Sequence, residues 1–437
     1  MGRKVIQAGL AMKVVRNQQG MALLVLLLIF TLIASLYVLR SLDSTGINNE
    51  RAKKTQKVLA EAKIGLLAFA SDRNLVHPLC ANNCRRPGDL PCPDTNNDGF
   101  AEGVCAVAAL GRLPWRTLGL KDLRDGYGER LWYAVSNRYK NSPRIQPLNS
   151  ETVATITLRN SVGNIINDGS LTTGLTAVVI APGPAFIRAD ATAQVRNGAN
   201  QNLAVNYLDN AFGEDNQNFV DGTVNGFISG QVRDGVGNLL VNDIILPISR
   251  EDMIEVMEKR VIAEARNEFR SYFNNEGALS YPAPANFADV TCLGVANIIA
   301  PNCSESPAFT GGRIPANPNA PWNVTSILRG DNNSNWFQQN GWREQVYYAV
   351  APACVTGTAS CSGVGFLTLN NALLPGARQL VLIASASVLA GQTRVTPADR
   401  TQEINYLEGE NFLPLDDVYV RISPLTTLIN DRAISFP

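Results

Sequence analysis

Met21 to Leu39 is an apolar run of 19 residues without a charged side chain. As a helix that rises about 1.5 Å per residue, such a run spans close to 30 Å, the thickness of a bilayer core. Four basic residues and no acidic residue precede the run: Arg3, Lys4, Lys13 and Arg16. Because basic flanks stay on the cytoplasmic side, the run predicts a single-pass transmembrane helix over 21–39, with residues from Arg40 onward outside the cytoplasm.

Composition excludes several classes of function. The chain has 38 basic and 38 acidic residues without the concentrated basic face that nucleic-acid binding needs. Its single histidine and the lack of a nucleophile or phosphate-binding motif predict that it is not an enzyme, although a hydrolase built from carboxylates alone stays an unsupported alternative.

The junction before the apolar run carries a processing motif. Arg16 to Leu24 reads RNQQGMALL and places Gly20 between a basic leader and the run. This resembles the class III signal of type IV pilins and type II secretion pseudopilins, in which a prepilin peptidase cleaves after the glycine and methylates the new N-terminus. The resemblance implies a leader peptide over 1–20, a mature chain that starts at Met21, and a bacterial inner-membrane location with the heads in the periplasm.

One position departs from the family pattern. Most pilins carry glutamate at the fifth mature residue, and this chain has Val25 there. The resemblance therefore implies a minor pilin or pseudopilin, a structural and interaction subunit or tip component that contacts other pilins or pseudopilins through the membrane helix, and secreted proteins or surfaces through its heads. The alternative is an uncleaved single-pass inner-membrane protein with two periplasmic binding modules that does not assemble.

A second helical pattern follows, from about Glu50 to Asp72. Its apolar residues recur at steps of three and four and predict one buried face: Val58, Leu59, Ala62, Leu66 and Phe69. A membrane helix that continues as an amphipathic helix is typical of the pilin stalk.

The exported part contains an internal repeat. Six motifs recur in the same order: Val58–Lys63 with Val261–Arg266, Leu90–Pro93 with Tyr281–Pro284, Gly111–Pro114 with Gly312–Pro315, Gly126–Val135 with Gly341–Val350, Ala177–Ala181 with Leu380–Ala384, and Asn206–Asp209 with Asn405–Glu408. They predict two pilin-like periplasmic domains, 40–248 (the first half) and 249–437 (the second half), in an α+β fold. Each half is expected to be a helix followed by an antiparallel sheet. Ser249 to Asp252 predicts a capping box that starts the second helix.

An acidic loop in the first half predicts a calcium site. Its candidate ligands are Asp94, Asn96 and Asp98 at positions 1, 3 and 5, the carbonyl of Phe100 at position 7 and Glu102 at position 9, with Gly99 at the turn. Calcium takes six to eight oxygen ligands in loops of this kind. The alternative is a polar turn held by its own Asn and Asp side chains. The second half has Ala285 to Asp289 there and is predicted to bind no metal.

The eight cysteines suit an oxidising compartment. Eight cysteines allow 105 pairings, and the sequence does not decide between them. Proximity in the sequence favours four disulfides: Cys80 with Cys84, Cys92 with Cys105, Cys292 with Cys303 and Cys354 with Cys361. The first four cysteines also have spacings that allow a zinc site, which the predicted export disfavours.

Overall fold

The computed structural model describes residues 19–72, 86–105, 109–145, 147–220, 226–276, 279–294, 303–330, 335–356, 361, 367–370, 377–412, 417–421 and 429–436. For residues 19–28, 32–45, 370, 377 and 436 it describes the backbone alone. The chain divides into two compact units, 1–54 and 55–437. Cys80 and Cys84 lie outside the described residues.

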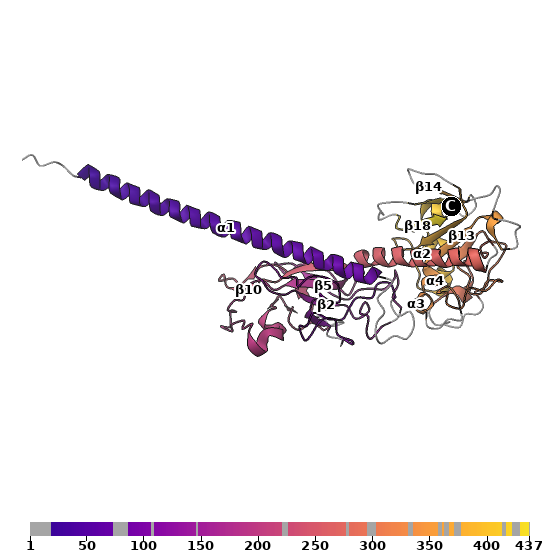
Figure 1. Ribbon diagram of the computed structural model, residues 1–437, viewed down its shortest axis with the longest axis horizontal. Coiled ribbons are helices and arrows are strands. Elements are labelled where there is room, and N and C mark those ends of the chain that lie inside the picture. Colours follow the sequence, from indigo (N-terminus) through magenta and orange to yellow (C-terminus); the bar gives the residue numbers. More distant parts are fainter. Residues whose placement is uncertain are drawn as a thin grey trace, which may run out of the picture. The chain divides into compact units, whose positions relative to one another are not determined.

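Helix α1, labelled in Figure 1, runs without a break from Gln19 to Ser71. Within the described part of the chain, no helix is both long enough and apolar enough to cross a membrane. The predicted transmembrane helix over 21–39, the fold class that included it and the inner-membrane location are therefore wrong. The apolar run is part of one continuous helix that also contains the charged residues Arg40, Asp43 and Glu50.

The last turns of α1 belong to the second unit and carry the predicted apolar face. All five residues of that face are buried: Val58, Leu59, Ala62, Leu66 and Phe69. Four of them join the main hydrophobic core together with Tyr133 and Val179 of the first sheet. The 3.6-residue period of the sequence therefore identified the side of the helix that packs.

The sheet of the first half has four antiparallel strands. They are β1 (Leu110–Arg112), β2 (Trp132–Val135), β5 (Leu175–Ala181) and β11 (Ile244–Ser249), in the order β1-β2-β5-β11. Strand β5 is buried at every position, as its continuous apolar sequence LTAVVIA requires.

The sheet of the second half repeats this arrangement. Its antiparallel strands are β12 (Gly311–Arg313), β13 (Val346–Val350), β16 (Leu380–Ala384) and β18 (Arg432–Phe436), in the order β12-β13-β16-β18. Arg112 pairs with Trp132 in the first sheet, and Arg313 pairs with Tyr347 in the second. The aligned sequence motifs thus occupy equivalent strands.

Smaller elements complete the second unit. Two three-stranded sheets are β4-β3-β8 (Ile165–Asn167, Leu158–Arg159, Phe227–Ile228) and β15-β14-β17 (Ala377–Arg378, Leu367–Asn370, Val418–Val420). Two ribbons are β6-β7 (Asn210–Ala211, Glu214–Asp215) and β10-β9 (Leu239–Val241, Val232–Arg233). The short helices are α3 (Trp336–Gln339), α4 (Trp342–Gln345), α5 (Pro397–Arg400) and the 3-10 turns η1 (Gly198–Asn202), η2 (Ala204–Asn206), η3 (Val290–Cys292), η4 (Pro352–Cys354), η5 (Glu403–Asn405) and η6 (Gly409–Phe412).

Helix α2 (Arg250–Asn275) connects the halves and follows β11 directly. The predicted capping box is confirmed, because the Ser249 hydroxyl accepts from the Asp252 amide and the Asp252 carboxylate accepts from the Ser249 amide. The apolar residues Met253, Met257, Val261, Ala265, Phe269 and Tyr272 of α2 are buried. The helix packs on β16 and β18 of the second sheet and on β5 and β11 of the first. Figure 1 shows α2 beside the strands of the second sheet.

Polar contacts also join the halves inside the second unit. Asn340 of the second half accepts from the Leu148 amide at 2.8 Å, and its carbonyl accepts from the Asn149 side chain at 2.9 Å. Arg250 donates to the Thr152 carbonyl at 2.9 Å. Since one hydrophobic core contains residues of both halves, we expect the halves to move as one body.

Candidate functional site

The predicted calcium loop is a turn held by its own side chains. The Asp94 carboxylate accepts from the amides of Asn97 at 2.6 Å and Gly99 at 2.7 Å. Asn96 accepts from the Asp98 amide at 2.9 Å. Gly99 has φ +90°, and an added Cβ would lie 2.6 Å from the Trp115 indole nitrogen, so this position requires glycine.

The loop oxygens face amides of the loop. Asp98 accepts from the Phe100 amide at 2.7 Å, and Glu102 accepts from the Thr95 amide at 3.1 Å. Among the described residues, no group of three or more acidic, histidine or cysteine side chains is placed to hold a metal ion. This geometry is that of the polar turn, and calcium binding stays a prediction of the sequence.

The loop is clamped at its base by a disulfide. Cys92 and Cys105 are bonded, as are Cys292 with Cys303 and Cys354 with Cys361. These three predicted disulfides are confirmed. Because Cys92 and Cys105 are bonded to each other, they are not available as thiolate ligands for the zinc alternative.

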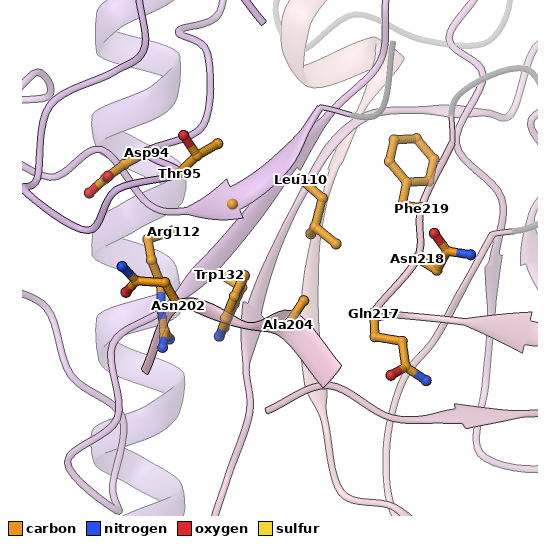
Figure 2. Close-up of a pocket in the computed structure, with 11 residues that line it drawn as sticks. Asp94, Thr95, Leu110, Arg112, Trp132, Asn202, Ala204, Gln217, Asn218 and Phe219 are labelled. Atoms are coloured by element: carbon orange, nitrogen blue, oxygen red, sulfur yellow. The ribbon is translucent and has the colours of Figure 1, made fainter. Parts of the chain in front are cut away.

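A cavity of about 200 Å³ lies next to the loop, and we call it the Arg112 pocket (Figure 2). It is lined by Asp94, Thr95, Leu110, Gly111, Arg112, Trp132, Asn202, Ala204, Gln217, Asn218 and Phe219. Strands β1 and β2 place Arg112 and Trp132 opposite each other. An isolated bridge pairs Asp94 with Arg112 and fixes the loop against the edge strand.

The Arg112 guanidinium is buried and rigidly held. Its two Nη atoms donate to the carbonyls of Arg130 and Gln201, each at 3.0 Å. The guanidinium carbon lies 4.1 Å from the centre of the Trp132 ring and 4.0 Å from that of Tyr207. Burial lowers the pKa of Arg112 to about 10, so the side chain stays cationic at neutral pH.

Three polar atoms at the pocket have no hydrogen-bond partner among the described residues. They are Nε of Arg112, Nε1 of Trp132 and Oδ1 of Asn202. Arg112 and Trp132 are only 4% and 3% exposed. A buried donor without a partner destabilises a fold by about 1–3 kcal/mol, and such atoms are rare in native structures. These atoms are enclosed by protein and are not presented to the open part of the pocket.

In the second half, backbone carbonyls accept hydrogen bonds from the equivalent arginine, Arg313. Arg313 donates through Nε to the Phe287 carbonyl at 3.0 Å, and its Nη atoms donate to the carbonyls of Glu344 and Arg400, each at 2.6 Å. The Phe287 ring lies 4.0 Å from the guanidinium carbon. Phe287 follows the bridge residue Ala285 by two positions, as Asn96 follows Asp94. The two equivalent arginines therefore differ at Nε, which donates to a backbone carbonyl in Arg313 and has no partner among the described residues in Arg112.

A buried carboxylate pair lies elsewhere in the first half. Asp243 accepts from the Asp209 amide at 2.9 Å and from the Asn216 side chain at 2.8 Å, while Asp209 accepts from Gln194 at 2.7 Å. Burial raises the pKa of Asp209 to about 6, and burial together with the Asp209 charge raises that of Asp243 well above its usual value. Both residues are fully buried, out of reach of a substrate in solvent.

The second half repeats this network. Asp431 accepts from the Glu408 amide at 2.9 Å and from Asn411 at 3.3 Å, and Glu408 accepts from Gln392 at 2.8 Å. Burial raises the pKa of Asp431 well above its usual value. The recurrent sequence motif at Asp209 and Glu408 is therefore explained by a structural network.

Sequence reasoning missed the pocket residues. Arg112 and Trp132 were part of recurrent motifs and Asp94 of the predicted calcium loop, but Asn202 and Phe219 carried no signal of their own. Gly20 and Met21 lie in the first turn of α1, and their side chains are outside the described part.

Comparison with protein-family models, curated proteins and solved structures finds no match to this chain. The resemblance to pilins therefore rests on the sequence motifs alone.

Proposed function

We propose that this chain is a minor pilin or pseudopilin, an interaction subunit of a type IV pilus or a type II secretion pseudopilus. Its proposed partners are a prepilin peptidase, other pilin-like subunits that contact α1, and secreted proteins or surfaces that contact the heads. The proposal assigns no catalytic step.

The observation that carries the proposal is the extent of α1. The helix begins at Gln19, beside the predicted cleavage point after Gly20, and reaches Ser71. In the family that the leader resembles, the segment after the cleavage point is the helix through which subunits assemble. On α1, Ile29, Phe30 and Ile47 are 51%, 70% and 53% exposed. An exposed apolar surface on a helix favours binding of a partner that covers it. The helices of other subunits would provide an apolar surface of this kind.

The joined halves support the part of the proposal that concerns the heads. The shared core and the hydrogen bonds of Asn340 and Arg250 join them, and a rigid surface loses less conformational entropy on binding than a flexible one. Val25, which replaces the family glutamate, supports a minor rather than a major subunit.

The test is to express the full chain in hosts with and without a prepilin peptidase and to measure the mass of the N-terminal peptide by mass spectrometry. We expect a product that starts at methylated Met21 only when the peptidase is present, and none from Gly20→Ala. Gly46→Ala is the matched control, since an added Cβ there meets nothing within 4 Å. A product that retains Arg16 to Gly20 in both hosts would overturn the proposal.

A further inference from the structure

We propose that a basic pocket of the second half binds the phosphate group of a ligand. The pocket has a volume of about 160 Å³, and we call it the Arg266 pocket. It is lined by Lys259, Ile262, Ala263, Arg266, Arg421, Arg432, Ala433 and Ile434, of which four are basic and none is acidic. The inference does not depend on filament assembly, because the pocket belongs to the second half alone.

Elements that are far apart in the sequence bring the basic side chains together. Lys259 and Arg266 are seven positions apart on α2, close to two helical turns, and therefore share one face of the helix. Arg432 is the first residue of β18, which packs on α2. Arg421 directly follows β17. The fold thus places four cations around one small cavity.

The acids of α2 neutralise this cluster only in part. Glu255 accepts from Lys259 at 2.5 Å, but both side chains are more than half exposed, so solvent screens the pair. Glu258 lies 3.5 Å from Nε of Arg432. Burial raises the pKa of Glu258 to about 8, so its carboxyl is mostly protonated at neutral pH and leaves the charge of Arg432 uncompensated.

The other two arginines have no counter-charge. Among the described residues, no hydrogen bond or ion pair holds the side chain of Arg266 or Arg421. Nε of Arg266 is enclosed by protein, so a ligand would meet its Nη atoms. Ile262 and Ala433, which also line the pocket, are only 2% and 1% exposed. A cavity with charges of one sign and apolar walls concentrates the electric field, which favours binding of an anion.

The number of donors favours phosphate over carboxylate. A guanidinium matches the oxygens of either group, but a carboxylate has one charge and two oxygens. A phosphate monoester carries a charge of about −1.5 to −2 at pH 7 and three acceptor oxygens, so it can use three arginines and a lysine at once. The cavity of about 160 Å³ is far above the ~15 Å³ that one water needs and below the ~300 Å³ of pockets for drug-sized ligands. It therefore suits one small charged group, which soluble phosphate esters and lipid headgroups both carry.

The first half shows that the fold does not require this cluster on its helix. Lys63 of α1 aligns with Arg266 in the recurrent helix motif. Lys63 is paired with Asp252 at 2.6 Å, whereas Arg266 has no such partner among the described residues. Continued towards the N-terminus, the same alignment places the neutral Gln56 at the position of Lys259. Two cations of the second half thus correspond to one paired cation in the first.

The strand differs in the same way. Arg432 pairs with Ala384 in the second sheet, and Ile244 pairs with Ala181 in the first. Ala384 and Ala181 end the same recurrent motif, so Ile244 is the equivalent of Arg432. An apolar residue therefore stands where the second half has a cation. The basic pocket is a local feature of the second half rather than a consequence of the repeated architecture.

The test is titration of the full chain at pH 7 and constant low ionic strength, followed by isothermal titration calorimetry. Glycerol 3-phosphate is the soluble probe, and acetate is the carboxylate comparison. A second arm measures sedimentation of the chain with phosphatidylcholine vesicles that contain phosphatidic acid, against vesicles of phosphatidylcholine alone. We expect saturable millimolar binding of glycerol 3-phosphate, at least tenfold tighter than that of acetate, if the source is a soluble ester. Binding that depends on phosphatidic acid, without binding of the soluble probe, would identify a lipid headgroup as the source. No binding in either phosphate arm, or acetate bound as tightly as the phosphate, would overturn the proposal.

Two variants locate the binding. Arg266→Gln and Arg421→Gln each remove one charge of the pocket and leave no described acid without its partner. Each is expected to weaken phosphate binding more than about tenfold while the melting temperature is kept. The matched control is Arg270→Gln, which removes an exposed charge one turn further along α2, outside the pocket lining, and is expected to bind as the wild type does. Unchanged binding in Arg266→Gln, or an equal loss in Arg270→Gln, would also overturn the proposal.

Discussion

Glu258 on α2 makes the stability of the second unit depend on pH. The side chain is fully buried, accepts from the Ser150 hydroxyl at 3.2 Å, and lies 3.5 Å from Nε of Arg432. Burial raises the pKa of Glu258 from 4.5 to about 8. The folded chain therefore keeps this proton over a pH range in which the unfolded chain has lost it.

The sign and size of the effect follow from linkage. Between about pH 4.5 and about pH 8 the folded state binds more protons, so the free energy of unfolding falls as the pH rises. One group contributes about 1.4 kcal/mol per pH unit, so the loss across this window is about 5 kcal/mol. Glu258→Gln removes the titration and keeps an oxygen for Ser150. We expect the variant to equal the wild type near pH 4.5 and to be several kcal/mol more stable near pH 8.

The assay is urea unfolding of both proteins at pH values from 5 to 8. Glu255→Gln, one turn earlier on α2, is the control: the hydrogen bond from Lys259 holds the pKa of Glu255 below its usual value, so this residue stays ionised throughout. Its profile should run parallel to that of the wild type. The other buried carboxylates are present in all three proteins and cancel in the comparison. Parallel profiles for Glu258→Gln and the wild type would refute the reasoning.

Three further predictions concern the first half. Replacing Cys92 and Cys105 together by serine should lower the free energy of unfolding by about 3 kcal/mol, because the bond closes a loop with a sequence separation of 13; urea unfolding measures it. Gly88→Ala should destabilise by about 1–3 kcal/mol, since the residue has φ +89° and the new Cβ would lie 2.3 Å from a methionine sulfur. Gly119→Ala, with φ +67° and open space, should have a smaller effect in the same assay. If the acidic loop binds calcium as its sequence predicts, calcium should raise the melting temperature of the wild type but not of Asp94→Asn, and an unchanged wild-type value would contradict it.

Features that depend on close neighbours in the chain were predictable. The capping box of α2 needs only Ser249 and Asp252, three positions apart. The three described disulfides join cysteines 13, 11 and 7 positions apart, and proximity alone predicted them. The turn at Asp94 likewise forms from contacts within five residues, as the polar-turn alternative required.

The prediction of a transmembrane helix was wrong. It rested on the hydropathy of the run from Met21 to Leu39, which is read in a window of about that length, whereas no helix in the described part of the chain is both long enough and apolar enough to cross a membrane. The structure joins the run to a helix that ends at Ser71.

The sequence by itself determined the local elements: the apolar face of α1, the cap at Ser249 and the order of recurrent motifs. Only the tertiary structure decided which polar groups are desolvated. Glu258 meets Ser150 across 108 positions, and Arg112 reaches the Gln201 carbonyl across 89. Burial, a shifted pKa and an unpaired donor are set by all the atoms around a group. Residues far apart in the chain supply most of those atoms, so neither spacing nor composition reveals them.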